Sequence, residues 1–318
     1  MPPRSPLPQR HGLDAAWART PGTYEGGEPP WATMRAFLME RLPARAMVAD
    51  MLEAGDFVDQ AGLSLTGAEA YRPHTFVWFH RALTPETPAP FAINVLEVNE
   101  RFVVADKPHF MATTPRGAHV IETALVKLRV ALDLPELAPA HRLDRLTAGV
   151  LVFTARREYR GAYAGVFQSG DAHKTYEALA PFDPAIEFPR TLIGRIEKRR
   201  GSLQAELVPG EPNAETLVEI VEVIGGHARY RLAPRTGKTH QLRVHMASLG
   251  LPILGDSLYP TVIDVDPGDF TDPLQLIARR LWFTDPIDGT QRDYTSRFEL
   301  QWPDGSVGLS AEKTADAG

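Results

Sequence analysis

The chain contains no cysteine, and this absence removes several kinds of chemistry at once. Disulfides, thiolate nucleophiles and cysteine-ligated zinc sites are excluded, and the composition suits a reducing cytoplasm. No apolar run approaches the roughly 20 residues that span a bilayer. The proline-rich N-terminal stretch also lacks the apolar core of a secretion signal. We therefore expect a cytoplasmic protein that does not associate with membranes.

An excess of positive charge is also missing, because the net charge at pH 7 is -6. Proteins that bind nucleic acid over their whole surface are typically basic, so any such binding should be confined to a local groove. With 318 residues, 43% of them hydrophobic, the chain can form one large domain and one small domain. The abundance of alanine, arginine and proline suggests a bacterial source with GC-rich DNA.

Changes in composition along the chain predict five segments. Proline-rich stretches with few large apolar residues are typical of flexible tails and linkers. The segments are a flexible tail at 1–31, a small domain at 32–82, a stiff linker at 83–91, a main domain at 92–305 and a flexible tail at 306–318.

Hydrophobic periodicity predicts the elements of the two domains. In the small domain, apolar residues at helical spacing predict two helices, near 34–42 and 47–52, and apolar runs predict strands at 57–58 and 76–79. In the main domain we expect strands at 102–104, 150–153, 176–179, 217–224 and 228–233, and helices at 119–132, 158–168 and 239–249. Because strands and helices do not alternate regularly, the order favours an α+β fold with a mixed, mainly antiparallel sheet.

The segment His141–Gly149 places one carboxylate, Asp144, between two arginines, Arg142 and Arg145, just before an apolar strand. Nearby positive charge favours the ionised form of an acid, so Asp144 should be ionised at neutral pH. A positioned, ionised carboxylate can act as a nucleophile. Taken alone, the same segment also fits a surface ion pair.

The block His141-Arg142-Leu143-Asp144, followed by Thr147-Ala148-Gly149, resembles the signature of the RluA-type pseudouridine synthases, which isomerise uridine in ribosomal or transfer RNA. Further blocks of that family occur before and after this one, in the expected order, and together the blocks cover about two thirds of the chain. They are Val104–Pro108, Lys174–Ala178, Arg235–His245, Pro252–Asp256 with Leu258-Tyr259, and a last block of Leu276, Ala278, Leu281, Phe283 and Pro286. One departure is Asp285, at a position where the family has histidine.

The resemblance implies a set of catalytic residues. Asp144 would be the essential carboxylate, and Tyr176 would stack on the flipped uracil. Arg243 would orient Asp144 through a bidentate contact from the planar fork of its guanidinium. Because the isomerisation neither oxidises its substrate nor transfers a group from a donor, no cofactor is expected. Attack of Asp144 on the base, attack on the sugar and removal of a sugar proton all remain open.

A second set of residues suits RNA binding. Arg235 and Lys238 lie beside Thr236-Gly237, where a glycine lets the RNA backbone approach closely. Arg142 would fill the space left by the flipped base or hold a neighbouring phosphate. Arg145 and His240 complete the predicted RNA-binding set.

The small domain, with two short helices and a hairpin, resembles a degenerate S-four-type RNA-binding module. Acidic residues offset its arginines, so RNA contact and a purely structural role are both open. We favour ribosomal over transfer RNA as the substrate, and we expect a monomer.

Two alternatives belong to other functional classes. A metallohydrolase would need a histidine pair four residues apart on a helix, whereas His240 and His245 are five apart, so no metal is expected. The other alternative is an inactive homologue that binds or remodels RNA. The presence of Asp144, Tyr176 and Arg243 together argues against it, because RNA binding alone does not require this set.

Overall fold

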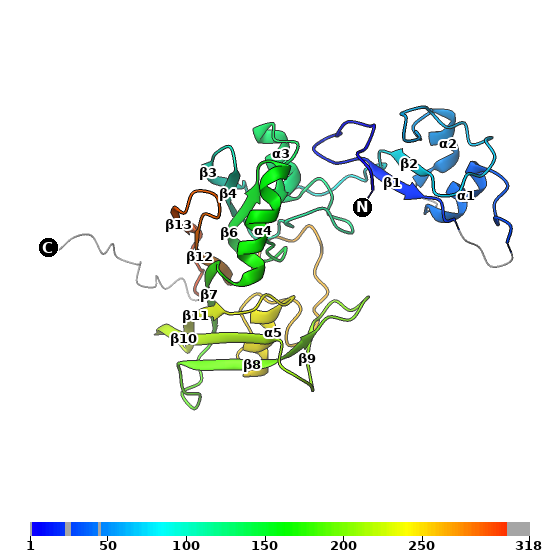
Figure 1. Ribbon diagram of the computed structural model, residues 1–318. Coiled ribbons are helices and arrows are strands. Elements are labelled where there is room, and N and C mark those ends of the chain that lie inside the picture. The colour runs from blue at the N-terminus through cyan, green and yellow to red at the C-terminus, as the bar shows by residue number, and fades with distance from the viewer. Residues whose placement is uncertain (1, 23–26, 44–45, 304–318) are drawn as a thin grey trace. The chain divides into compact units, whose positions relative to one another are not determined.

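The computed structural model describes residues 2–22, 27–43 and 46–303, and the chain forms two compact units (Figure 1). The N-terminal unit comprises Met1–Glu86 with Arg129–Pro135, and the main unit comprises Thr87–Leu128 with Glu136–Gly318. The division at Glu86 falls within the segment predicted to be a linker, while the domain limits themselves remain a proposal. The predicted tail at 306–318 lies outside the described residues.

The N-terminal unit contains a two-stranded antiparallel sheet and two short helices. Strand β1 (Ala16–Arg19) pairs with β2 (Phe76–Phe79), and the helices are α1 (Met34–Arg41) and α2 (Val48–Glu53). The prediction of a flexible tail over 1–31 is therefore wrong for β1, whose alanines pack against the apolar core of this unit. The strand predicted at 57–58 forms only isolated bridges. Both predicted helices are present, and Thr33 caps the first by accepting a hydrogen bond from the Ala36 amide.

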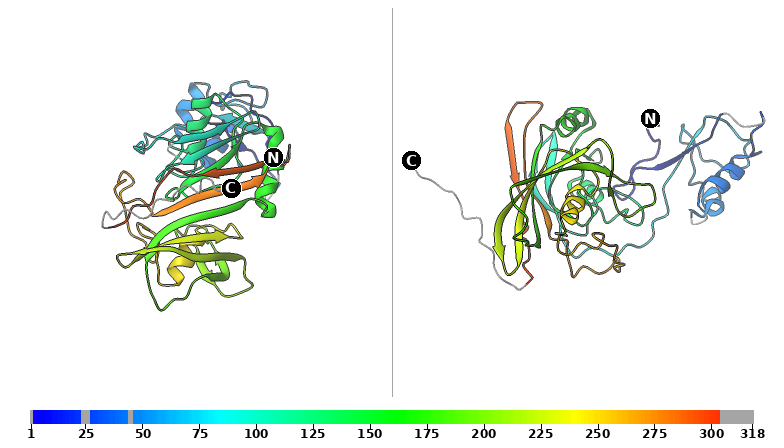
Figure 2. Two further views of the ribbon diagram at one scale, coloured as in Figure 1. Left: turned by 90° about the vertical axis from the view of Figure 1, so that its left-hand side faces the viewer. Right: turned by 90° about the horizontal axis from the view of Figure 1, so that it is seen from below.

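The main unit is built on a large mixed sheet. Among the described residues its strand order is β3-β4-β6-β12-β7-β11-β10-β8-β9, with β5 paired to β6 and β13 paired to β12. Among the described strands of this sheet, β6 and β12 pair in parallel, and the other pairs are antiparallel. Figure 2 shows the molecule from two further directions. The predicted α+β class with a mainly antiparallel sheet is thus confirmed. The strands are β3 (Asn94–Val98), β4 (Phe102–Lys107), β5 (Ala138–Pro139), β6 (Ala148–Thr154), β7 (His173–Pro181), β8 (Arg190–Glu197), β9 (Glu206–Val208), β10 (Ala214–Ile224), β11 (His227–Pro234), β12 (Leu276–Thr284) and β13 (Gln291–Thr295).

Three α-helices accompany this sheet in the part of the chain that the structure describes: α3 (Ala124–Leu132), α4 (Arg160–Ser169) and α5 (Gln241–Ser248). Helix α4, preceded by a short 3-10 turn at Arg157–Tyr159, buries Tyr163 and Val166 against strands β4, β6 and β12. Helix α5 buries Leu242 and Met246 against strands β7, β10 and β11. No helix among the described residues is long and apolar enough to cross a membrane.

Strand β6 is buried along its whole length, because it lies between β4 and β12 in the sheet. Gly149 makes this position possible. Its φ is +119°, and a Cβ atom added there would lie 2.3 Å from the Ala278 carbonyl oxygen of β12. The glycine that ends the Thr147–Gly149 block therefore has a packing role, and it fixes where the preceding loop leaves the sheet.

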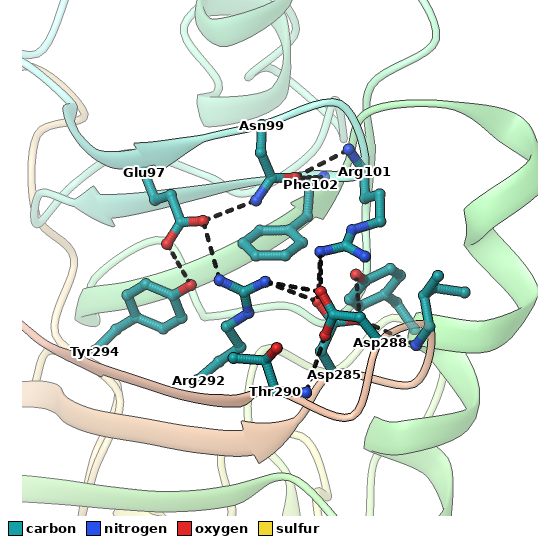
Figure 3. Close-up of polar contacts among 11 residues, drawn as sticks. Glu97, Asn99, Arg101, Phe102, Asp285, Asp288, Thr290, Arg292 and Tyr294 are labelled. Atoms are coloured by element: carbon teal, nitrogen blue, oxygen red, sulfur yellow. Dashed lines mark hydrogen bonds and ion pairs between the residues drawn. The ribbon is translucent and has the colours of Figure 1, made fainter.

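An ion network centred on the buried Asp285 connects the β12–β13 turn to the β3–β4 turn (Figure 3). Asp285, the departure from the family pattern, accepts a hydrogen bond from the Tyr163 hydroxyl at 2.9 Å. Its carboxylate also pairs with Arg101 at 3.2 Å and with Arg292 at 3.3 Å. A buried carboxylate with two cationic partners is tolerated where an unpaired one would be costly, so Asp285 connects the two turns.

Candidate active site

Asp144 lies in the loop that joins β5 to β6, and backbone contacts hold this loop on both sides of it. On one side, the Leu143 amide donates to Thr113 Oγ1 at 3.1 Å, and this hydroxyl donates to the Leu143 carbonyl at 2.7 Å. On the other side, His109 Nδ1 donates to the Leu146 carbonyl at 2.7 Å. The carboxylate of Asp144 is therefore presented by a fixed piece of backbone.

Lys107, at the end of β4, adds a third attachment. Its buried ammonium donates to the carbonyls of Met111 at 2.7 Å, Pro108 at 2.9 Å and, more weakly, Arg145 at 3.4 Å. Burial lowers the pKa of Lys107 to about 7, with Asp144 acting in the opposite direction. Lys107 therefore has a structural role, because its ammonium contacts the loop that carries Asp144.

Arg243 approaches Asp144 from helix α5. Its guanidinium is buried, and Nη1 lies 3.9 Å from Asp144 Oδ2. The guanidinium fork is directed elsewhere: Nε and Nη2 donate to the two carboxylate oxygens of Asp256 at 2.8 and 2.6 Å. Asp256 also accepts from the amides of Leu258 and Tyr259 at 2.8 and 3.1 Å. The predicted fork from Arg243 to Asp144 is therefore wrong, because the more deeply buried carboxylate takes the bidentate contact.

Tyr176 lies on β7 and lines the same cavity as Asp144. Burial and, to a smaller extent, the Asp144 carboxylate raise the pKa of its hydroxyl well above the usual value. The phenol is therefore neutral at physiological pH. A neutral aromatic ring in the wall of a cavity can stack on a base.

His240 precedes α5 with φ at +57°, and its Nδ1 lies 3.0 Å from the Tyr259 hydroxyl. Burial lowers the pKa of His240 to about 4, so the ring is neutral at pH 7. The Tyr259 ring also lies 5.3 Å from the Arg243 guanidinium carbon, which places His240 and Arg243 on the same aromatic support.

The cavity around Asp144 has a volume of about 630 Å³ and an unusual charge. Asp144 is the only carboxylate among the described residues that line it. Seven cations share the wall: Arg116, Arg142, Arg145, Lys174, Lys198, Lys238 and Arg243. In a chain with a net charge of -6, such a surplus of positive charge marks a site for a polyanion.

Comparison with known proteins agrees with this geometry. Residues 101–248 match the family model described as RNA pseudouridylate synthase. An uncharacterized RNA pseudouridine synthase of Haemophilus influenzae is 38% identical over 128 residues, which are 40% of this chain and 57% of that protein. The dual-specificity RNA pseudouridine synthase RluA of Vibrio cholerae is 31% identical over 61% of this chain and 78% of its own length. The chain belongs to the RluA-type family of RNA pseudouridine synthases.

A solved structure supports the fold of the synthase independently. Human RNA pseudouridylate synthase domain containing 1 superimposes with a TM-score of 0.54 over 70% of this chain and 89% of that chain, at 22% identity. At this identity the likeness establishes the fold. The synthase is therefore an isomerase by family, with the pseudouridine synthase catalytic fold.

The structure brings most of the predicted site residues of the synthase together. Asp144, Tyr176 and Arg243 line one cavity with Arg142, Arg145, Lys238 and His240. Arg145 is engaged within the protein, because its guanidinium carbon lies 5.8 Å from the centre of the Phe110 ring and Nη1 lies 3.4 Å from the Phe110 carbonyl oxygen. Arg235 does not line the cavity and pairs with Glu215 at 2.9 Å.

Sequence reasoning did not identify Asp256, Thr113 or Lys174 as parts of the site. Asp256 stands in a recognised family block, but nothing in the block indicates its partner. Lys174 had a usable signal: it lies two residues before Tyr176 on a strand, and residues two apart share a face.

No group of three or more potential metal ligands occurs among the described residues. The two histidines considered as a metal pair have different partners. His240 contacts the Tyr259 hydroxyl, and His245 Nδ1 lies 3.0 Å from Thr216 Oγ1. Their separation follows from the spacing of five residues, which places them on different sides of the helix.

Proposed function

We propose that Asp144 is the catalytic carboxylate of this synthase and that it acts on a uridine flipped out of structured RNA into the cavity. The observation that carries this proposal is the position of Asp144, which is the one carboxylate among the described lining residues, beside seven cations and 3.9 Å from a buried arginine. The reaction breaks the bond from N1 of uracil to C1′ of ribose and forms a bond from C5 to C1′. C5 loses a proton and N1 gains one, so the substrate and product are isomers.

The proposed role of Arg243 is to face the Asp144 carboxylate and keep it oriented during this exchange. Asp256 fixes the guanidinium through two hydrogen bonds, which leaves Nη1 directed toward Asp144. Attack on the base, attack on the sugar and removal of a sugar proton each require an ionised acid. The Asp144–Arg243–Asp256 arrangement supports all three.

Tyr176 is proposed to stack on the flipped uracil. An enzyme that acts on the base–sugar bond must take the base out of its stack, at a cost of a few kcal/mol. Stacking on an aromatic ring in the cavity wall offsets part of the free energy of flipping, since base–aromatic stacking contributes about 1–3 kcal/mol. The neutral hydroxyl of Tyr176 is also available for the proton transfer at C5.

The surplus of cations favours RNA phosphates as the groups held at the rim. Arg142, Lys238 and His240 are proposed to contact the RNA, whereas Arg145 and Arg235 are already paired within the protein. We propose ribosomal RNA as the first substrate to test. The relative from Vibrio cholerae is named for dual specificity, so transfer RNA belongs in the same test. Action as a monomer, in the cytoplasm and without a cofactor is part of the proposal.

The test is a map of pseudouridine across total RNA from cells in which the gene is deleted and then complemented. The proposal predicts at least one site that is lost on deletion and restored by the wild-type gene but not by Asp144→Ala. That site also names the substrate. If no site is lost, or if Asp144→Ala restores it, the assignment of Asp144 fails and an inactive RNA-binding role becomes the better account.

A further inference from the structure

Lys174 is a lysine in the cavity wall with no partner among the residues that the structure describes. Strand β7 alternates, so His173 stacks on Trp282 on one face and Glu177 pairs with Arg279 on that same face. Lys174 and Tyr176 lie on the opposite face and both line the cavity. The Lys174 ammonium forms no ion pair and no hydrogen bond with any residue that the structure describes, although the side chain is half-buried.

His141 also lines the cavity, and its ring is fixed. It stacks on Phe167 with the ring centres 4.3 Å apart, and the Val152 amide donates to Nε2 at 3.2 Å. With Nε2 accepting, the proton of the neutral ring is on Nδ1. Burial, and to a smaller extent the nearby charge of Lys174, lowers the pKa of His141 to about 3. The neutral ring therefore has one N–H donor, on Nδ1, in a residue that lines the cavity together with Lys174.

This combination is suited to an anion. A cation that has lost part of its water and has no counter-charge is unfavourable in the free protein. Arrival of an anionic oxygen would supply the missing charge, and an N–H donor in the same cavity would supply a second hydrogen bond. Tyr176, the ring proposed for the base, is two residues away on the same face, about 6.6 Å along the strand.

We propose that Lys174 and His141 form a subsite for one phosphate of the RNA backbone beside the target uridine. The subsite rests on the proposed function of the cavity and adds to it the position of one phosphate. The unpaired Lys174 ammonium lowers the stability of the free protein and is stabilised when RNA binds. Replacing it with an uncharged side chain of similar length should therefore weaken RNA binding without lowering the stability of the fold.

The first experiment measures the affinity of the full chain for a stem–loop RNA with one loop uridine, over a series of salt concentrations. All variants carry Asp144→Asn so that product does not accumulate. Each phosphate contact contributes about 0.7–0.9 to the slope of log K against log salt. Lys174→Met should reduce the slope by about one such contact and weaken binding at low salt by roughly tenfold. Lys174→Arg should restore the slope.

Lys127→Met is the matched control. Lys127 lies on α3, outside the cavity, and pairs with Glu122 at 2.7 Å, so its loss should leave the slope unchanged. Thermal unfolding gives the second readout. If the subsite is correct, the protein with Lys174→Met should unfold at the same temperature as the Asp144→Asn protein or at a higher one. A lower unfolding temperature with an unchanged slope would show a structural lysine and overturn the proposal.

The second experiment neutralises phosphates of the RNA one at a time with methylphosphonate linkages. The Asp144→Asn protein should lose affinity when one linkage beside the target uridine is neutralised, by about as much as it loses through Lys174→Met. The protein that also carries Lys174→Met should bind this modified RNA as well as it binds the unmodified RNA. If the affinity lost through Lys174→Met adds to the affinity lost through the methylphosphonate at every linkage, the proposed subsite is wrong. This result is distinct from failure of the proposed function, which is decided by whether Asp144→Ala forms pseudouridine.

Discussion

At the scale of single residues, the site depends on groups that hold Asp144 rather than on Asp144 alone. Lys107, Thr113 and His109 bind the backbone of its loop, and Asp256 fixes the arginine that faces its carboxylate. Because the backbone of its loop is already fixed, Asp144 needs little reorientation when substrate binds, and the free-energy cost of that step is small. Positioning of this kind accounts for a large share of catalysis in general.

Arg243→Lys should lower turnover by on the order of a hundredfold, because a lysine cannot bind Asp256 with two parallel bonds and still face Asp144. It should also lower the free energy of unfolding by about 1–3 kcal/mol, since Asp256 would lose a hydrogen bond in a buried place. Single-turnover kinetics and urea unfolding measure the two effects. Arg280→Lys is the control, because Arg280 makes the same kind of fork with Asp293 on the exposed surface. Equal effects of the two substitutions would contradict the account.

Lys107 predicts a specific dependence of stability on pH. Its pKa is about 7 in the folded protein and near 10.5 when unfolded, so between these values the unfolded chain binds more protons. The free energy of unfolding should therefore rise with pH, and this one group should contribute about 2 kcal/mol between pH 7 and pH 9. Urea unfolding of the wild type and of Lys107→Met at both pH values isolates the effect. The rise should be smaller by that amount in the variant, and parallel curves would argue against a buried, deprotonating lysine.

The sequence was enough to name Asp144, Tyr176 and Arg243 as residues of one site, because each stands in a recognisable block. It was not enough to predict which carboxylate the arginine fork binds. That outcome depends on the relative burial of Asp144 and Asp256, which are far apart in the sequence and meet only through the fold. Contacts of this kind are set by tertiary packing and leave no local pattern.

At the scale of elements, apolar runs predicted the buried strands, and polar strands were missed. Strand β6 is apolar and buried, and it was predicted. Strand β13, Gln291–Thr295, is polar and alternates between exposed and half-buried residues, so composition gave little indication of it. Strand β1 was assigned to a tail because its neighbours are prolines, although it pairs with β2 over four residues.

Gly149→Ala tests the element that links the sheet to the site. The added Cβ would lie 2.3 Å from the Ala278 carbonyl oxygen, and the residue has φ at +119°. We expect a loss of at least about 2 kcal/mol of stability and a matching loss of active protein. Gly161→Ala on α4 is the control, since nothing lies within 4 Å of its Cβ position. It should be neutral or stabilising by about 0.5–1 kcal/mol. A stable, active Gly149→Ala protein would show that β6 and β12 have room to separate.

At the scale of the whole molecule, the main feature is the contrast between an acidic chain and a basic cavity. A net charge of -6 is combined with seven lining cations around Asp144. The negative remainder of the protein repels RNA elsewhere, so binding should be directed to the cavity. The sequence predicted only that positive charge would gather in a local groove. It could not predict which cations line the cavity, because they come from segments that are distant in the chain.

We therefore expect kcat/KM on substrate RNA to fall steeply with salt, as for a protein that contacts several phosphates. Five such contacts would give a slope of about -3.5 to -4.5 in log kcat/KM against log salt. The measurement is initial rates of pseudouridine formation over a range of potassium chloride concentrations. A rate that does not change with salt would show that the cations of the cavity are not used for RNA phosphates.

The most direct test of the central claim is the single-turnover rate of pseudouridine formation by purified Asp144→Asn, with RNA affinity and thermal unfolding measured on the same protein. Asp144 is about one third exposed and has one ion pair with the described residues, at 3.9 Å, so the fold and the binding of RNA should be retained. The account predicts that the variant binds substrate RNA with near wild-type affinity and forms no detectable pseudouridine. Product formation at a rate within tenfold of the wild type would contradict the assignment of Asp144 as the catalytic carboxylate.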